Sequence, residues 1–264
     1  MQNTKFTILN ISTLPEFKRL IRNEDLQSHF DELQESEISI DTFSFYTSVA
    51  VVFSSKIEGE DIELDSYVKH KRFGIEFLPD YTRKIDDLYN SYQFAKESEF
   101  VEKNILQAHK YLTKHILPKN RQGQIRTGNM YVTTSDGKIE YVAASPFNLK
   151  EELFNFYQDV DSLLKADLDV SEVFYFASML HLVFVKIHPF NDGNGRTSRL
   201  IEKWFLAVKL GPKAWLLQSE KNYYMQHQTY YNHIRRLGTE YDHLDYDKAL
   251  PFLSMLPQSL IQPK

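Results

Sequence analysis

The sequence contains no cysteine among its 264 residues. This absence excludes disulfide bonds and thiol catalysis, and it fits a reducing compartment. Basic residues are also not in excess: the formal net charge is −5, so we expect no general nucleic-acid-binding surface. No internal repeat or low-complexity segment is present. What the chain does have is 42% hydrophobic and 14% aromatic residues, enough to bury a sizeable core.

Features of export and membrane insertion are missing as well. Met1 to Leu14 has no basic segment followed by an apolar core, so we expect no secretory signal and a cytoplasmic location. The most apolar run, Val173 to Ile187, contains Ser178, His181 and Lys186. We interpret it as a buried helix, too short and too polar to span a bilayer, and we expect no membrane partner.

Most of the chain has the apolar spacing of helices. The runs expected to be helical are 16–36 (one or two surface helices), 38–58, 64–73, 78–94, 102–116, 149–164, 170–187, 200–210 (amphipathic), 220–237 and 246–260. Asp41 or Thr42 would cap the second run, Gly59 would end it, and Pro251 would lie in the first turn of the last. The β-rich runs 129–134 and 138–143 flank Ser135-Asp136-Gly137 and predict a hairpin. The sequence therefore predicts a mainly α fold with one small β-hairpin.

Between two of these helices, residues 188–199 read His-Pro-Phe-Asn-Asp-Gly-Asn-Gly-Arg-Thr-Ser-Arg. Pro189 should end the first helix and restrict His188 to extended geometry. Gly193 and Gly195 allow positive φ and bring bare N–H groups to the start of the next helix, where the dipole also favours an anion.

Charged side chains add to this turn. Arg196 and Arg199 share one helix face and complete an anion cradle suited to a polyphosphate. Asp192 would repel a phosphate unless a divalent cation bridges the two. His188 can take a proton from a hydroxyl near neutral pH. Base, metal ligand and anion cradle together indicate nucleotidyl or phosphoryl transfer.

The pattern His-Pro-Phe-x-x-Gly-Asn-Gly-Arg-x-x-Arg resembles the signature of Fic-domain proteins, and every position of it is matched. The resemblance implies a Fic fold: a helical bundle with a small β-hairpin flap over the catalytic loop. It also implies transfer of AMP from ATP to a Ser, Thr or Tyr hydroxyl of a target protein, with Mg²⁺ as cofactor.

The resemblance further implies a role for each matched residue. In order these are His188 (general base), Phe190 (anchor in the core), Asp192 (Mg²⁺ ligand), Gly193, Asn194 and Gly195 (α-phosphate), Arg196 and Arg199 (outer phosphates), and Tyr230 with Tyr231 (adenine pocket). The hairpin resembles the family's flap, where a target segment adds as a strand. Gly123, Arg126, Ser145 and Pro146 resemble the residues that flank that flap.

An upstream motif, Ser54-Ser55-Lys56-Ile57-Glu58-Gly59, predicts a switch. Ser54 and Glu58 share one helix face, and a carboxylate at a helix C-terminus opposes the dipole, so another group should hold Glu58. The motif, with Ser54, Glu58 and Gly59, resembles the inhibitory helix of Fic proteins. Glu58 would then pair with Arg199 in a bidentate contact, which implies low basal activity and self-modification once the contact is lost.

This interpretation divides the chain into residues 1–97 (with the inhibitory helix at about 41–59), 98–240 (Fic core, with the flap at about 128–145 and the catalytic loop at 188–199) and a closing helix, 241–264. Residues 16–36 offer a candidate homodimer surface. Alternative functions are deadenylylation, phosphotransfer as in Doc-like proteins, or a non-enzymatic interaction module. The intact Gly-Asn-Gly sequence favours AMP transfer.

Overall fold

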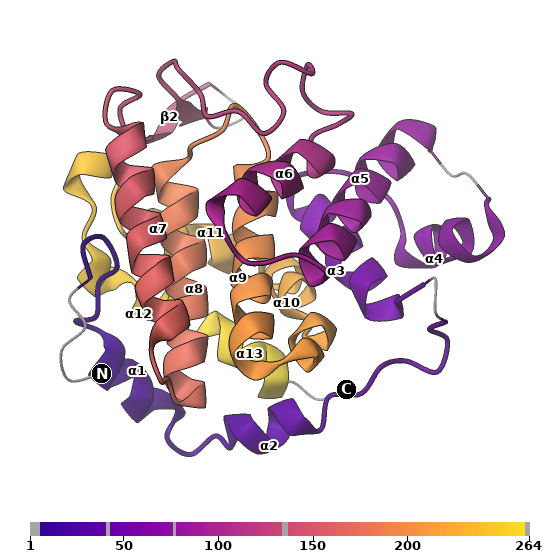
Figure 1. Ribbon diagram of the computed structural model, residues 1–264, viewed down its shortest axis with the longest axis horizontal. Helices are drawn as coiled ribbons and strands as arrows, with labels where there is room; N and C mark the ends of the chain where they lie inside the picture. The colour runs from indigo at the N-terminus through magenta and orange to yellow at the C-terminus, as the bar shows by residue number, and fades with distance from the viewer. Residues whose placement is uncertain (1–5, 41–42, 76–77, 134–136, 262–264) are drawn as a thin grey trace.

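The computed structural model describes residues 6–40, 43–75, 78–133 and 137–261 of the chain (Figure 1). Its helices and strands are α1 Leu14–Ile21, α2 Leu26–Asp31, α3 Phe45–Ile57, α4 Leu64–Phe73, α5 Pro79–Lys96, α6 Glu102–Leu112, β1 Tyr131–Thr133, β2 Ile139–Val142, α7 Leu149–Lys165, α8 Val170–Ile187, α9 Asn194–Leu210, α10 Ser219–Met225, α11 His227–Arg235, α12 Leu250–Leu253 and α13 Met255–Ile261. Short 3-10 segments lie at Pro212–Leu216, Tyr241–His243 and Tyr246–Lys248. The expected mainly α fold with a small hairpin is confirmed.

Helix α8 runs through the middle of the molecule beside α9 (Figure 1). It is buried at every position from Val173 to Phe184, as expected for a helix that is apolar all round. By length and composition, Val170–Ile187 could cross a membrane, so the prediction that it is too short was wrong. However, 78% of that stretch is buried within the fold, in agreement with its interpretation as a core helix.

Helix α9 is also enclosed, although the sequence predicted an amphipathic helix from Leu200 onward. Glu202 and Lys203 are both fully buried. Each has an oppositely charged or hydrogen-bonding partner: Glu202 Oε2 is 2.7 Å from His181 Nδ1, and Lys203 Nζ is 2.6 Å from Glu220 Oε2. Buried charges persist only when they are paired in this way. Paired charges therefore allow α9 to be buried on the face that the sequence pattern assigned to solvent.

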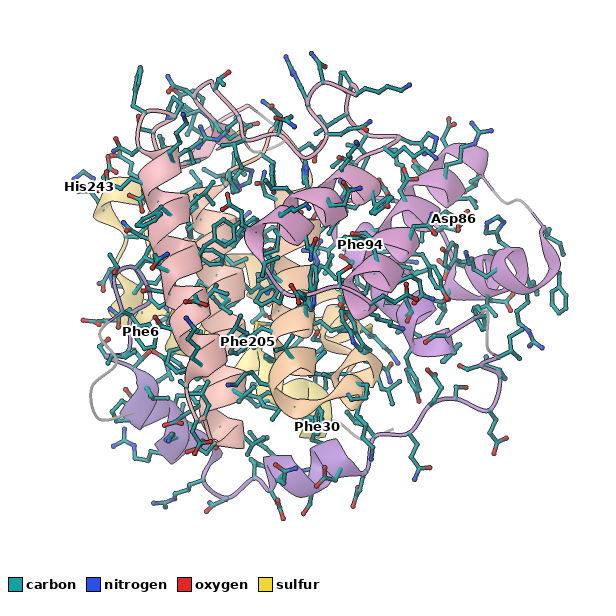
Figure 2. All side chains as sticks on the ribbon, in the orientation of Figure 1. Phe6, Phe30, Asp86, Phe94, Phe205 and His243 are labelled. Atoms are coloured by element: carbon teal, nitrogen blue, oxygen red, sulfur yellow. The ribbon has the colours of Figure 1, made fainter. Side chains whose placement is uncertain are left out.

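The remaining helices enclose this central pair. Helix α7 packs on α8, and α3, α5 and α6 contact α9. Phe205 of α9 lies deep among the helices in Figure 2 and is fully buried, whereas His243 lies at the periphery. Helices α1 and α2 bury Phe17 and Phe30 within the chain, and Leu20 stays 55% exposed. The candidate dimer surface at 16–36 therefore uses much of its apolar area internally.

Strands β1 and β2 form the predicted antiparallel hairpin, with Tyr131 opposite Val142. The predicted turn lies outside the described residues except for Gly137, which has φ +81°. β2 is also tied to the chain after α11, because the Val142 N–H donates to the Thr239 carbonyl at 2.8 Å. β2 thus pairs with β1 on one side and makes a single bridge, at Val142, on the other.

Several helix boundaries differ from the prediction, and three of the runs illustrate this. Helix α3 begins at Phe45 and is capped by Ser44, while the expected caps Asp41 and Thr42 lie outside the described residues. It ends as expected before Gly59, which has φ +88°. The run 220–237 is broken at Gln226 into α10 and α11. The run 246–260 is divided as well, since Pro257 has no N–H to continue a helix begun at Leu250. The division of the chain into 1–97, 98–240 and 241–264 stays a prediction.

Asp159 of α7 fastens the N-terminal segment to the bundle. Its carboxylate is 2% exposed and accepts the backbone N–H groups of Thr7, Ile8 and Leu9 at 2.8–3.0 Å. We expect Asp159→Ala to lower the free energy of unfolding in urea by about 2–4 kcal/mol, because these donors lose their acceptor. The matched control is Asp161→Ala on the same helix, where the exposed pair with Lys165 should contribute less than about 0.5 kcal/mol. Equal losses in the two variants would contradict this account.

Candidate active site

The residue that ends α8 is His188, in the left-handed conformation at φ 55° and ψ 58°. The prediction that Pro189 holds it extended was therefore wrong. In the left-handed conformation the His188 N–H bonds back to the Phe184 carbonyl at 3.1 Å, and its own carbonyl accepts the Arg126 Nε–H at 2.7 Å. These two bonds compensate for a conformation that non-glycine residues rarely adopt.

The imidazole of His188 is arranged to act as a base. Its Nδ1 lies 3.1 Å from the Val185 carbonyl, which can only accept, so Nδ1 carries the hydrogen and Nε2 has the free lone pair. Burial lowers the pKa of His188, and the positive charge of Arg126 adds to that effect. The ring is therefore neutral at pH 7 and can take up a proton.

The loop that follows His188 is anchored on His109 of α6. The ring of Phe190 is fully buried and stacks on the His109 ring, with 3.6 Å between centroids. His109 Nε2–H donates to the Asp192 carbonyl, and Nδ1 accepts the Gly123 N–H, both at 2.9 Å. Burial lowers the pKa of His109 to about 4, so the ring stays neutral and keeps this single tautomer. The buried Phe190 is placed as the resemblance implied.

Asn194 closes the loop from the start of α9. Its side chain is 2% exposed and closes the loop on one residue: Oδ1 accepts the Phe190 N–H and Nδ2 donates to the Phe190 carbonyl, both at 2.9 Å. The side chain thus has a role within the loop, and its implied contact with the α-phosphate stays a prediction. Gly193 has φ +80°, and a Cβ there would lie 2.9 Å from Thr113 Cγ2, so the turn needs glycine. The N–H groups at the start of α9 are what the loop presents to an anion.

Arg199 is 1% exposed and meets the end of α3. Its Nη2 lies 2.7 Å from Glu58 Oε1, so the two expected partners are brought together. The contact uses one carboxylate oxygen, so the predicted bidentate geometry was wrong. Three more guanidinium hydrogens have partners: Nε donates to Ser54 Oγ at 2.8 Å, Nη2 to the Ser54 carbonyl at 3.0 Å, and Nη1 to Tyr230 Oη at 3.3 Å.

The carboxylate of Glu58 occupies an anion position at the start of α9. A Cβ on Gly195 would lie only 2.5 Å from Glu58 Oε1, so glycine at 195 leaves the space that the carboxylate fills. Burial by itself would raise the pKa of Glu58. The charges of Arg199 and Arg196 outweigh burial and lower this pKa overall, so Glu58 is ionised.

Arg196 has a carboxylate of its own that the sequence analysis missed. Its guanidinium is 5% exposed, with Nη1 3.4 Å from Glu60 Oε1 and Nη2 3.6 Å from Asp192 Oδ1. Lys84 Nζ also lies 3.4 Å from Glu60 Oε1. Burial raises the pKa of Glu60, since the Arg196 and Lys84 charges only partly offset it. The signal in the sequence was a second glutamate directly after Gly59.

Asp192 is the residue that could hold a metal. Its side chain is 49% exposed, and its Oδ1 accepts the Gly193 N–H at 2.5 Å. Across the described ranges no group of three or more metal-binding side chains occurs. A single half-exposed carboxylate beside the anion position at the start of α9 fits Mg²⁺. This ion usually takes one or two carboxylates and completes its shell with phosphates and water.

Residues 99–206 match the Fic/DOC family. Nearly the whole chain also superimposes on a Fic family protein from Desulfovibrio desulfuricans G20, with TM-score 0.75 and 18% identity over 97% of this chain and 74% of that one. The chain therefore contains a Fic domain at residues 99–206. A second Fic structure, Fic-1 from C. elegans, superimposes with TM-score 0.68 and 18% identity over 94% of this chain and 70% of that one.

Two curated relatives of this Fic-domain chain are both called protein adenylyltransferase Fic. The one from Nematostella vectensis is 27% identical over 144 residues, which is 54% of this chain and 31% of the relative. The one from Drosophila willistoni is 27% identical over 154 residues, or 58% of this chain and 28% of the relative. The chain thus spans about a third of the length of these relatives.

The two tyrosines implied for the adenine pocket have different surroundings in the Fic-domain chain. Tyr230 is 1% exposed and packs in the core on Tyr223 and Phe252, so it does not line an open pocket. Tyr231 is half-buried, with its hydroxyl 3.4 Å from the Ile57 carbonyl at the end of α3. Its place in the adenine pocket stays a prediction.

The flap is joined to the catalytic loop of the Fic domain through Arg126. Besides His188, its buried guanidinium binds the carbonyls of Gly128 at 2.7 Å and Ala144 at 2.5 Å, which lie at the two ends of the hairpin. Its backbone N–H donates to the Pro189 carbonyl at 2.9 Å. In the sequence Arg126 stood out only as a residue flanking the expected flap, whereas in the structure it fixes the hairpin and loop 188–199 relative to each other.

Proposed function

We propose that this Fic domain transfers AMP from ATP to a Ser, Thr or Tyr hydroxyl of a target protein, and that the activity is autoinhibited. One observation carries the proposal. A neutral His188 with a free Nε2 adjoins the start of α9, where the buried Arg196 and Arg199 already hold the carboxylates of Glu60 and Glu58. We call this place, formed by the start of α9 and the two arginines, the anion seat. The names of the curated relatives support AMP as the transferred group.

The chemistry follows from these groups. His188 Nε2 takes the proton of the target hydroxyl, whose oxygen attacks the α-phosphorus of ATP. The bond from that phosphorus to the oxygen bridging to the β-phosphate breaks, and pyrophosphate leaves. The Val185 carbonyl holds the tautomer of His188 throughout. The start of α9 and the two arginines stabilise the charge on the phosphates, and Mg²⁺ held by Asp192 would neutralise charge on the departing pyrophosphate.

The flap is the docking place we propose for the target. β2 already pairs with β1 on one side and with Thr239 on the other. β1 therefore provides the edge on which an extended target segment can add by backbone hydrogen bonds. Arg126 carries that edge at a fixed distance from His188.

Autoinhibition follows from the position of Glu58. Its carboxylate takes the Arg199 hydrogen that an outer phosphate would use, and it fills the space above Gly195. A nucleotide that enters beside it is displaced, and a shift of about 1 Å from in-line geometry can reduce a rate on the order of a hundredfold.

We expect Glu58→Gly to raise transfer of labelled AMP to lysate proteins and to the chain itself by on the order of a hundredfold. Glu58→Gly combined with His188→Ala should return to background. The matched control is Glu63→Gly, which removes a nearby glutamate that pairs with Lys56 and contacts neither arginine. Mass spectrometry of the product distinguishes the functions: a gain of AMP supports the proposal, whereas a gain of phosphate or loss of a preformed AMP contradicts it.

We expect Glu60→Gln also to favour use of ATP, but with a smaller effect than Glu58→Gly. In the Glu58→Gly background we expect it to lower the KM for ATP by about threefold, since the contacts of Glu60 with Arg196 and Lys84 are long and Arg196 would be freed for phosphate. Initial-rate measurements at varied ATP concentration test this. A raised KM would instead mean that Glu60 holds Arg196 in place for the nucleotide.

The pH dependence should report His188. A base works in its neutral form, so activity is lost as pH falls through the His188 pKa, which burial holds below the ordinary value of about 6.5. Glu58 is one of the charges that raise this pKa, and its removal should therefore move the acidic limb further down. Profiles of kcat/KM for Glu58→Gly between about pH 5 and 8 should have an acidic limb centred below about 6.5. An acidic limb centred above 6.5 is incompatible with His188 as the base.

A further inference from the structure

Arg199 has one partner that does not come from the end of α3. Its Nη1 lies 3.3 Å from the hydroxyl of Tyr230 on α11, and that hydroxyl lies 3.0 Å from Nε2 of His181 on α8. His181 Nδ1 in turn lies 2.7 Å from Oε2 of Glu202 on α9. Tyr230 is 1% exposed, and both His181 and Glu202 are fully buried. Four side chains from three helices thus form one buried row that leads from the anion seat into the core.

The donors and acceptors in this row follow one direction. Arginine can only donate, so the Tyr230 oxygen accepts from Arg199 and its own hydrogen is available to His181 Nε2. Nε2 can accept that hydrogen when the ring proton is on Nδ1, and Nδ1 faces the Glu202 carboxylate, which accepts it. The hydroxyl of Tyr223 donates to the same Glu202 oxygen at 2.8 Å. Each link therefore fixes the orientation of the next, from Glu202 back to Arg199.

This support remains when the contacts with α3 change. Ser54 and Glu58, the other partners of Arg199, both belong to the α3 end. A phosphate that replaces Glu58 can bind only if the Arg199 guanidinium keeps its orientation toward the anion seat. Tyr230 contacts Nη1, whereas Ser54 contacts Nε and Nη2. We propose that Tyr230, oriented by His181 and Glu202, is a positioning residue that holds Arg199 for the terminal phosphate and so sets the preference for a nucleoside triphosphate over a diphosphate. The inference rests on the proposed function and replaces the adenine-pocket role for Tyr230.

The test measures binding rather than turnover. The Glu58→Gly, His188→Ala protein provides the background, because its seat is open and its base is absent. Isothermal titration calorimetry with Mg²⁺ gives Kd for ATP and for ADP, and the ratio of the two reports the contact with the terminal phosphate. Thermal unfolding of each variant reports stability separately.

Tyr230→Phe removes the hydroxyl and keeps the ring. We expect the ADP-to-ATP ratio of Kd values to fall about tenfold, mainly through weaker ATP binding, since a hydrogen bond to a charged group is lost. The matched control is Tyr175→Phe, on α8. Tyr175 is also fully buried, and its hydroxyl makes two hydrogen bonds, with Asn10 and Thr13, away from the seat. Tyr175→Phe should lower the stability of the protein and leave the ADP-to-ATP ratio of Kd values unchanged.

A second variant tests the row behind Tyr230. His181→Asn keeps a donor near Glu202 but removes the acceptor of the Tyr230 hydrogen, so the ratio should fall by a smaller factor. A ratio in Tyr230→Phe and His181→Asn equal to that in Tyr175→Phe would overturn the inference while leaving the proposed function intact. A background protein that binds no ATP would overturn the proposed function, and the inference with it.

Discussion

The structure depends on one buried positive charge, the guanidinium of Arg199. At 1% exposure it cannot be hydrated, and an unpaired charge in such a place costs several kcal/mol. An anion must therefore be present, and the fold provides one in Glu58. Carboxylate and phosphate present similar oxygens to a guanidinium. In the proposed function the same charge binds either the chain's own glutamate or a nucleotide, and it cannot fully bind both.

Helix α9 extends this constraint to the bundle. It carries four buried charges, and each meets a different partner. The pairs are Arg196 with Glu60, Arg199 with Glu58, Glu202 with His181, and Lys203 with Glu220. These pairs connect α9 to the end of α3 and the turn after it, to α8 and to α10. This polar helix can occupy the centre because its neighbours bring complementary groups, including His181 of the mostly apolar α8. Two of these ion pairs thus hold the end of α3 and the turn after it against α9.

What could be predicted from the sequence was mostly local. The helical runs, the hairpin and the loop 188–199 follow from periodicity and turn residues within short windows. The partnership of Glu58 with Arg199 could be proposed because two motifs resembled parts of one family. Contacts between distant segments could not be found this way. His109 supports Asp192 from 83 residues upstream, and Tyr230 reaches Arg199 from another helix. His188 contradicts the rule for residues before proline because Arg126, far away in sequence, binds its carbonyl.

The geometry of Glu58 also explains how a strong contact can be released. The residue caps the C-terminus of α3, where the helix dipole disfavours a carboxylate, and it faces the N-terminus of α9, where the dipole favours one. The Glu58 carboxylate is therefore held by α9 alone, through the contact of Oε1 with Arg199. Ser54 and Tyr230 hold the same guanidinium from Nε and Nη1. In the proposed exchange of the carboxylate for a phosphate, Arg199 keeps Ser54 and Tyr230 as partners, so one contact changes and the arginine stays in place.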